Sequence, residues 1–346
     1  MTLHPSVAAV RRGVRRALAP LSPGETVLVA CSGGPDSLAL LAATVFEARR
    51  PALRVIGVTV DHGLQEGSRR QAARTVDQMA GLGADETFTV TVTVEDAGGL
   101  GPEAAARRAR YAALDQVADH VGAAVVLLGH TRDDQAETVL LGLARGSGGR
   151  SIAGMRRGFE RYRRPLLDVA RDDTVTACQV AGIEYWDDPH NSDPGYARVR
   201  VRTRVLPVLE EELGPGVAAA LARTADQLRA DMDLLDDLAE QRFAALGSPL
   251  PADALAGEPD ALRRRILRLA ALAAGAPAAE VFHDHVLALD SLVTDWHGQK
   301  WIDLPGHLRA TRRSGTLVIE RARADAPPAD GGPDPEAGSR PDSRPD

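Results

Sequence analysis

Short apolar runs alternate with longer amphipathic segments through the first half of the chain. The apolar runs predict buried strands at 27–30, 54–60, 87–94 and 125–128, with a short fifth strand near 162–167. The amphipathic segments predict helices at 38–48, 65–82, 102–121, 131–144 and 172–181. Strands that alternate with helices form parallel sheets, because each crossover returns the chain to the same edge. We therefore expect an α/β domain with a doubly wound, five-stranded parallel sheet and helices on both faces.

Two flanking regions extend this pattern. Val7, Val10, Val14 and Leu18 lie three to four residues apart with arginines between them, which predicts an amphipathic N-terminal helix. After Gly214 the composition changes, and helical periodicity predicts helices at 217–245, 261–274 and 281–293, then short strands at 300–304, 307–311 and 316–320. We expect a larger domain over 1–213, a smaller, mainly helical C-terminal domain over 214–324, and a disordered acidic tail over 325–346.

Bulk composition narrows the class of protein. The 346 residues are 44% hydrophobic, which suits a globular protein, and no apolar run reaches the length of a membrane span. The first residues lack the apolar stretch of a secretory signal. Cys31 and Cys178 are the only cysteines, which excludes a disulfide framework and a four-thiolate zinc site. We expect a cytoplasmic protein without a membrane partner.

Charge is distributed unevenly along the chain. The net charge of −7 argues at first against a nucleic-acid partner. The tail at 325–346 holds six acidic residues and two arginines, however, and so accounts for −4 of that charge. Arginines gather at 145–164, which holds seven of them, and at Arg198, Arg200, Arg202 and Arg204. Both stretches fit either phosphate contacts or a solvated charged surface, and the residues alone leave both interpretations open.

One glycine-rich loop joins the first strand to the helix that follows it. Its sequence is Ser32-Gly33-Gly34-Pro35-Asp36-Ser37. A helix that begins after glycines directs backbone N–H groups at an anion, and the glycines let phosphate oxygens approach the main chain. A bare carboxylate repels phosphate, so Asp36 predicts a divalent cation between the two. The loop has neither the Gly-Lys-Ser/Thr of a Walker motif nor the Gly-x-Gly-x-x-Gly of a dinucleotide site.

Two further strand ends carry polar groups. Asp61 and His62 follow the second strand, and Gly129 and His130 follow the fourth. Because parallel strands end at one edge of a sheet, we expect both pairs beside the glycine loop, at the edge where such sheets bind ligands.

The helix expected at 131–144 has an unusual polar face. His130, Asp134 and Glu137 stand at positions i, i+4 and i+7, so an imidazole and two carboxylates share one side. This face fits a metal site, recognition of an ammonium group, or capping of the helix N-terminus. The three interpretations stay open at this point.

The helix expected at 102–121 carries a second set of charges. Arg107 is four residues from Glu103, so an ordinary helical ion pair explains part of it. Arg110, beside Tyr111, instead fits a phosphate or the charge that develops on one during a reaction.

The loop resembles the Ser-Gly-Gly-x-Asp-Ser pyrophosphate loop of the N-type ATP pyrophosphatases, the PP-loop superfamily. Together with further motifs, it makes the stretch from roughly 25 to 210 similar to the tRNA(Ile)-lysidine synthetases of that superfamily. Those motifs are Asp61-His62-Gly63-Leu64, Glu103 to Tyr111, Gly129 to Thr138, Arg145-Gly146 with Gly148, Arg164-Pro165-Leu166-Leu167, and Trp186-x-Asp188-Pro189-x-Asn191-x-Asp193 with Tyr196. One departure is Val199, where the family often carries Asn after Arg198.

The resemblance implies a Rossmann-like catalytic domain, a tRNA-binding second domain and a two-step ligase reaction that uses ATP and Mg²⁺. ATP adenylates the C2 carbonyl oxygen of the wobble cytidine in the CAU anticodon of tRNA(Ile). The ε-amine of free L-lysine then displaces AMP. The product, lysidine, changes codon reading from AUG to AUA.

The resemblance also implies roles for the candidate residues. The loop residues Ser32, Gly33, Gly34, Pro35, Asp36 and Ser37 hold pyrophosphate, and Asp36 is in addition the Mg²⁺ ligand. Asp61, His62, Gly129 and His130 complete the ATP site. Asp134 and Glu137 hold or deprotonate the lysine amine, and Arg110 stabilises the adenylate phosphate. The expected substrate contacts are Arg107, Arg145, Arg150, Arg198 and Arg202.

Three alternative functions share parts of this pattern. A tRNA cytidine thiolase needs additional cysteines for its iron–sulfur cluster, and two cysteines are too few. An ammonia-using NAD synthetase is the small-molecule alternative, but it leaves the arginine-rich stretches and the second domain without a role. A tRNA-binding protein without catalysis is another, and Asp36, Asp134 and Glu137 argue against it. A homodimer is compatible with the resemblance, and the sequence does not test it.

Overall fold

The computed structural model describes residues 3–61, 63, 67–92, 102–146, 148–188 and 192–322. His62 and the acidic tail at 325–346, both singled out above, lie outside the described residues. The chain divides after Asp233 into two compact units, and each is described by itself. The boundary expected at 214–216 precedes this division, which falls inside the long helix α10 (Val217–Leu246).

Among the described residues of the first unit, six strands form one sheet in the order β3-β2-β1-β4-β6-β5. Their bounds are β1 Thr26–Ala30, β2 Arg54–Asp61, β3 Glu86–Thr91, β4 Ala123–Leu127, β5 Gly158–Phe159 and β6 Tyr162–Arg163. The five expected strands run parallel, and the two-residue strand β5 adds an antiparallel edge that the sequence pattern does not predict. The chain order reverses between β1 and β4, which is where doubly wound sheets bind their ligands.

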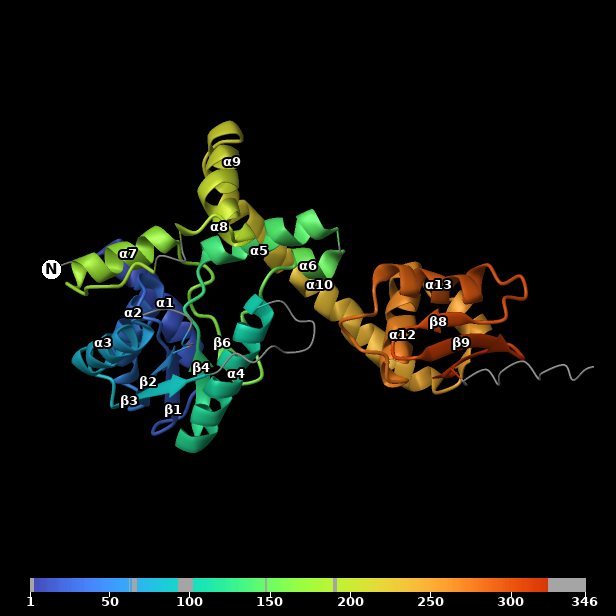
Figure 1. The fold of residues 1–346 in the computed structure, drawn as a ribbon, viewed down its shortest axis with the longest axis horizontal. Coiled ribbons are helices and arrows are strands. Elements are labelled where there is room, and N and C mark those ends of the chain that lie inside the picture. Colours follow the sequence, from blue (N-terminus) through green and yellow to red (C-terminus); the bar gives the residue numbers. More distant parts are fainter. Residues whose placement is uncertain are drawn as a thin grey trace, which may run out of the picture. The chain divides into compact units, whose positions relative to one another are not determined.

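Helices cover both faces of this sheet (Figure 1). One face carries α1 (Pro5–Leu18), α2 (Pro35–Ala48), α3 (Ser68–Gly81) and α7 (Arg171–Val180), and the other carries α4 (Pro102–Val121). Strand β1 shows why both faces are needed. Val27 and Val29 lie in the core with α1 and α2, and Leu28 lies in a second core with α4. Side chains alternate between the faces of a strand, so a strand covered on both sides is an unbroken apolar run.

The part of this unit that follows β4 contains short helices absent from the sequence prediction. After α5 (Arg132–Arg145), α6 (Gly149–Ile152) lies in the arginine-rich stretch at 145–164, where the sequence pattern predicts no helix. Farther along, α8 (Ala197–Arg200), the π-helix η2 (Val201–Val205) and α9 (Leu206–Glu212) follow one another without a break. This continuous segment packs against α5 and carries Arg198 and Arg202.

The second unit combines helices with a small antiparallel sheet in the order β7-β10-β9-β8. Its elements after α10 are β7 Leu250–Pro251, α11 Ala252–Ala256, α12 Asp260–Ala273, α13 His283–Thr294, β8 Ile302–Leu304, β9 Leu308–Arg313 and β10 Thr316–Arg321. The three expected helices and three expected strands are confirmed, whereas β7 and α11 were not expected. Among the described residues, no helix combines the length and the apolar character needed to cross a membrane.

Candidate active site

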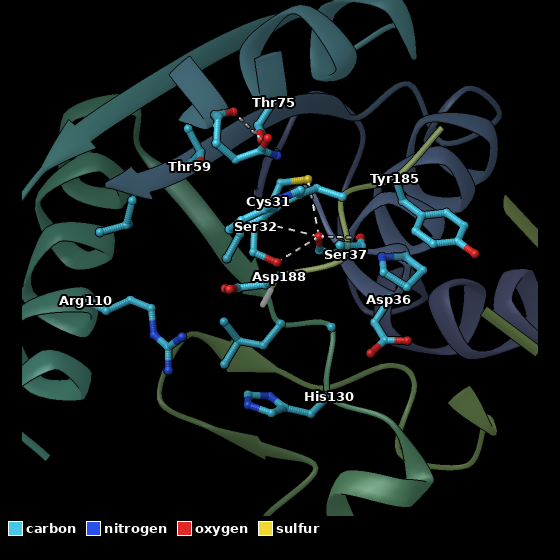
Figure 2. A pocket seen from close by; sticks show the side chains of 18 of the residues that line it. Cys31, Ser32, Asp36, Ser37, Thr59, Thr75, Arg110, His130, Tyr185 and Asp188 are labelled. Carbon is cyan, nitrogen blue, oxygen red and sulfur yellow. Dashed lines mark hydrogen bonds between the residues drawn. The ribbon is translucent and has the colours of Figure 1, made fainter. Parts of the chain in front are cut away.

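A cavity of about 850 Å³ lies at the carboxyl ends of β1, β2 and β4 (Figure 2). The glycine loop after β1, the end of β2 at Asp61, and Gly129 with His130 after β4 all line it. These strand ends meet at one edge, as a parallel sheet requires. The cavity is therefore the place where the chemistry of the candidate residues can act together.

Most candidate residues line this cavity. The loop and strand ends contribute Ser32, Gly34, Pro35, Asp36, Ser37, Asp61, Gly129 and His130. The helices contribute Arg107, Arg110, Asp134, Arg198 and Arg202. Glu137 is fully buried behind the wall, and the exposed residues Arg145 and Arg150 are not part of the lining.

Close contacts explain why the loop needs its glycines. Gly33 has a φ of +83°, and a Cβ on it would lie 2.6 Å from Thr75 Oγ1 and 2.8 Å from Gln71 Nε2. A Cβ on Gly129 would lie 3.2 Å from the backbone nitrogen of Ser37, so β4 and the loop approach each other main chain to main chain. Helix α2 begins at Pro35, and the N–H groups of its first turn have no partners within the helix. They are available to an anion at the cavity wall.

The Ser37 hydroxyl holds the loop closed. Ser37 Oγ accepts a hydrogen bond from the backbone nitrogen of Ser32 at 3.1 Å and donates to the carbonyl oxygen of Gly34 at 2.9 Å. The backbone nitrogen of Trp186 donates to the carbonyl oxygen of Gly33 at 2.9 Å and braces the loop from outside. Ser32 is exposed, so its hydroxyl is the better placed of the two for a ligand.

Asp36 is the carboxylate of the loop, and α7 supplies two of its neighbours. Thr174 Oγ1 donates to its Oδ1, and Arg171 Nη2 lies 3.6 Å from its Oδ2. Burial raises the pKa of Asp36 to about 6, although the charge of Arg171 acts in the opposite direction. Among the described residues, no group of three or more His, Cys, Asp or Glu is placed to hold a metal. A single carboxylate beside a phosphate site fits Mg²⁺, which completes its shell with phosphate and water oxygens.

Asp134 stands at the start of α5 and is held from three sides. The backbone nitrogen of Thr131 donates to Oδ2 at 2.8 Å, which completes a capping box. Arg171 Nη2 donates to Oδ1 at 2.8 Å, and Arg202 Nη2 does so at 3.4 Å. Burial works to raise the pKa of Asp134, but the charge of Arg171 and the other partners outweigh it and hold the pKa below its ordinary value. The carboxylate is therefore ionised at neutral pH.

Glu137, one turn along α5, binds two arginines of the segment formed by α8 and η2. Arg202 Nε donates to its Oε1 at 2.6 Å, and Arg198 Nη1 lies 3.4 Å from its Oε2. Arg198 and Arg202 are four residues apart, which places both on one face of the helix that packs against α5. Glu137 thus orients two cavity arginines, and a direct contact with a ligand would require them to move.

The arginine-rich stretch at 145–164 is largely structural. Arg156 pairs with Asp233, Arg157 with Asp168, and Arg161 with Asp119, while Arg163 donates to backbone carbonyls. Arg164 turns inward and is only 5% exposed. Because these arginines already have partners within the protein, a phosphate contact by one of them would have to replace an existing interaction.

On the cavity side of α4, Arg107 lies 5.2 Å from the ring centroid of Tyr111. The side chain of Glu103, its expected partner, lies outside the described residues. Arg110 points into the cavity from the same helix, opposite the glycine loop (Figure 2).

Comparison with known proteins shows the family to which a chain with this site belongs. Residues 8–209 match the family described as "PP-loop domain", and residues 250–318 match the family described as "TilS substrate binding domain". The chain is 57% identical to the tRNA(Ile)-lysidine synthase of Thermobifida fusca, over 91% of this chain and 98% of that protein. It is 51% identical to that of Streptomyces coelicolor, over 92% and 99% of the two chains. The chain belongs to the tRNA(Ile)-lysidine synthase family.

A solved structure supports the fold alone. The U34-tRNA thiolase NcsA from Methanococcus maripaludis, with its [4Fe-4S] cluster, superimposes with a TM-score of 0.55 at 19% identity. The match covers 64% of this chain and 79% of that one. At this identity the match shows a similar fold over that part of the chain and nothing about its chemistry.

The structure adds residues that the sequence pattern does not single out. Arg171 lies between Asp36 and Asp134, and Thr174 hydrogen-bonds Asp36. Arg171 is the first residue of α7, where a positive charge interacts unfavourably with the helix dipole. This unfavourable position is the one feature of the sequence that could have marked Arg171 as a functional residue. Gln71 and Tyr185 also line the cavity, and Val199, the departure from the family pattern, is buried.

Proposed function

We propose that this chain catalyses the formation of lysidine at the wobble cytidine of the CAU anticodon of tRNA(Ile), using ATP and free L-lysine. One observation carries the proposal. A single guanidinium, that of Arg171, is shared by Asp36 of the glycine loop and Asp134 of α5. The anion-binding end of the cavity and its carboxylate end are therefore adjacent, as a reaction between a phosphate ester and an amine requires.

The first step forms a bond between the C2 oxygen of the cytidine and the α-phosphorus of ATP. The bond from that phosphorus to the β-phosphate breaks, and pyrophosphate leaves. The first-turn N–H groups of α2 and the Ser32 hydroxyl bind the departing pyrophosphate, while Arg110 faces the charge that develops on the α-phosphoryl group. Mg²⁺, held by Asp36, neutralises charge on the phosphates when bound.

The second step forms a bond between the ε-nitrogen of lysine and C2. The bond from C2 to its oxygen breaks, AMP leaves with that oxygen and the electron pair, and the nitrogen releases a proton. Asp134 attracts the amine to this position because its carboxylate stays ionised. Its lowered pKa makes it a poor base at neutral pH, so we assign it binding and orientation of lysine rather than proton removal. Glu137 supports this site through Arg198 and Arg202.

The second unit supplies a surface suited to RNA. Segment 295–322 holds five basic and three acidic residues, whereas 234–294 holds five basic and nine acidic residues. Two of the three tryptophans of the chain lie in this segment, Trp296 at 45% and Trp301 at 42% exposure. Arg312 lies 5.1 Å from the ring centroid of Trp296, and Arg309 lies 4.5 Å from that of Trp301. Exposed aromatic faces beside arginines bind nucleotides by stacking and by phosphate contact. We propose that this surface contacts the tRNA, and we expect the enzyme to act in the cytoplasm.

Exchange of labelled pyrophosphate into ATP tests the adenylation step. We expect exchange that depends on Mg²⁺ and on unmodified tRNA(Ile) with a CAU anticodon, and that proceeds without lysine. Asp134→Asn should keep this exchange and lose lysine transfer, because the carboxylate acts in the second step. Exchange without any tRNA would instead mean that a small molecule is adenylated, and would contradict the proposed substrate.

A further inference from the structure

A buried cation lies directly behind the cavity wall. Arg164 is 5% exposed and donates three hydrogen bonds, to His130 Nδ1 at 3.3 Å, to the carbonyl oxygen of Arg156 at 2.6 Å, and to Tyr111 Oη at 3.3 Å. None of these three acceptors is a carboxylate. Burying a charge without an opposite charge is costly, so the arrangement calls for a reason beyond packing.

The contact with Arg164 determines where His130 carries its proton. A guanidinium has donors only, so the nitrogen that faces it must be an acceptor. His130 Nδ1 is therefore unprotonated, and the single proton of the ring is on Nε2. As long as this hydrogen bond lasts, the ring cannot become an imidazolium.

The surroundings of His130 act in the same direction. Burial, together with the charges of Arg164, Arg110 and Arg107, lowers its pKa to about 3, although the charge of Asp134 acts in the opposite direction. The ring is thus neutral throughout the physiological range. It keeps its Nε2 proton instead of passing it on, which makes it a hydrogen-bond donor and not a general acid.

The position of His130 places this donor at the reaction centre. His130 and Arg110 both extend into the cavity, across from the glycine loop (Figure 2). The preceding residue, Gly129, lies close against the loop, where a Cβ would come within 3.2 Å of the backbone of Ser37. The imidazole and the arginine assigned to the adenylate therefore both face the cavity across from the loop that takes pyrophosphate.

We infer that His130 donates a hydrogen bond from Nε2 to a non-bridging oxygen of the α-phosphoryl group during adenylation, and that Arg164 is the positioning residue that fixes its tautomer. This inference rests on the proposed function for its substrate. The tautomer itself is a property of the free enzyme. Fixed, neutral donors aimed at developing charge contribute strongly because they need no reorganisation during the reaction.

Nitrogen NMR of the free enzyme tests the tautomer without any activity. With ¹⁵N-labelled histidine, the signals of His130 are those that disappear in His130→Gln. We expect an Nε2-protonated, non-titrating ring between about pH 5.5 and 8.5, a range that lies well above its lowered pKa. In Arg164→Met the same ring should titrate or show both tautomers, because its fixed donor is gone. An Nδ1-protonated ring in the wild type, or an unchanged ring in Arg164→Met, would overturn the assignment.

A matched pair of variants tests the donor role. The amide nitrogen of Gln reaches about as far as Nε2, whereas that of Asn reaches only as far as Nδ1. We expect His130→Asn to lower tRNA-dependent pyrophosphate exchange by about 100-fold, the usual loss for one donor of this kind, and His130→Gln to lose less than about 10-fold. Equal losses in the two variants would contradict donation from Nε2.

The proposed function and the role of His130 and Arg164 can be tested separately. If the wild-type enzyme shows no tRNA-dependent exchange, the proposed function is wrong, and the NMR result on the tautomer still stands. If exchange is present but the ring is Nδ1-protonated, the function stands and the role given to His130 and Arg164 is wrong. Arg164→Lys keeps a group that has donors only, so we expect it to retain the Nε2-protonated ring that Arg164→Met loses.

Discussion

Arg171 Nη2 donates to Asp134 Oδ1 across 2.8 Å, and the same atom lies 3.6 Å from Asp36 Oδ2. One guanidinium therefore offsets part of the charge of two carboxylates that belong to different steps of the proposed reaction. Without it, two buried negative charges would face each other and raise each other's pKa. Arg171 is thus expected to set the charge state of the whole cavity.

Arg171→Met should impair adenylation and lysine transfer together. The pKa of Asp36, which Arg171 holds down, should rise further, so less of the ionised carboxylate is present to bind Mg²⁺. We expect a loss of about 100-fold in pyrophosphate exchange, partly recovered by raising the Mg²⁺ concentration. Arg161→Met, which removes an exposed ion pair with Asp119, is the matched control and should stay within about 2-fold of wild type. Equal effects of the two variants would contradict the role of Arg171.

Asp36→Asn should abolish activity and stabilise the metal-free protein. The pKa of Asp36 in the folded protein, about 6, lies above its ordinary value of 3.8. A carboxyl with a raised pKa costs stability as pH rises from about 4 to 6, and the full cost remains above that window. The Asn variant should therefore gain roughly 1–3 kcal/mol at pH 8 and nothing at pH 4. Urea unfolding at the two pH values, with a chelator present, measures the difference.

The substitution Asp168→Asn should change the unfolding free energy in the opposite direction, so it is the control for that experiment. Hydrogen bonding to Arg157 lowers the pKa of Asp168, so its stabilising contribution is present at neutral pH and is lost as pH falls below the ordinary range of a carboxyl. Asp168→Asn should therefore destabilise the protein at pH 8. A gain in stability in both variants would show that the changes act through something other than charge.

Gly33→Ala should disable the glycine loop, and Gly24→Ala should not. Both glycines have a positive φ, +83° and +85°, so both substitutions carry a similar backbone strain of about 1–2 kcal/mol. Only at Gly33 does the added methyl group meet neighbours, Thr75 and Gln71, while nothing lies within 4 Å at Gly24. We expect Gly33→Ala to lose more unfolding free energy than Gly24→Ala, and we expect Gly33→Ala alone to lose pyrophosphate exchange. Full activity of Gly33→Ala would contradict the crowding argument.

The tryptophans of the second unit should contribute to tRNA affinity. Stacking of a base on an aromatic side chain is worth about 1–3 kcal/mol, so the double variant Trp296→Ala with Trp301→Ala should weaken tRNA binding by about 10-fold or more. Phe282→Ala is the control, because Phe282 is also exposed but stands between Glu280 and Asp284. Filter binding with labelled tRNA measures all three proteins. An equal, small effect in both cases would place the RNA contacts elsewhere.

The core of the first unit and the edge that holds the site were predictable from local pattern. The run from Val27 to Ala30 is apolar because its alternate side chains enter two different cores, and such runs occur in strands covered on both faces. Once the strands are known to be parallel, the groups after β1, β2 and β4 must share an edge. The loop Ser32–Ser37 could be recognised from the family motif because its residues are contiguous in the sequence.

The remaining features depend on contacts that no local pattern encodes. Thr174 and Asp36 are 138 residues apart in sequence, and Arg171 reaches Asp134 across 37 residues. The carboxylate of Glu137 was expected to meet a ligand, yet its helical spacing from Asp134 could not show that Arg198 and Arg202 already hold it. The sequence shows that Arg198 and Arg202 are four residues apart. This spacing places them on one face only because the segment through η2 is helical, which the sequence pattern did not predict.

Transfer of labelled lysine to tRNA tests the central claim most directly. Purified enzyme is incubated with ATP, Mg²⁺, labelled L-lysine and unmodified tRNA(Ile) bearing CAU, with elongator tRNA(Met), which has the same anticodon, in a parallel reaction. We predict one lysine incorporated per tRNA(Ile), release of AMP in equal amount, and no incorporation into tRNA(Met). Release of AMP without label in the RNA would contradict the account, because the adenylated group would then belong to another acceptor.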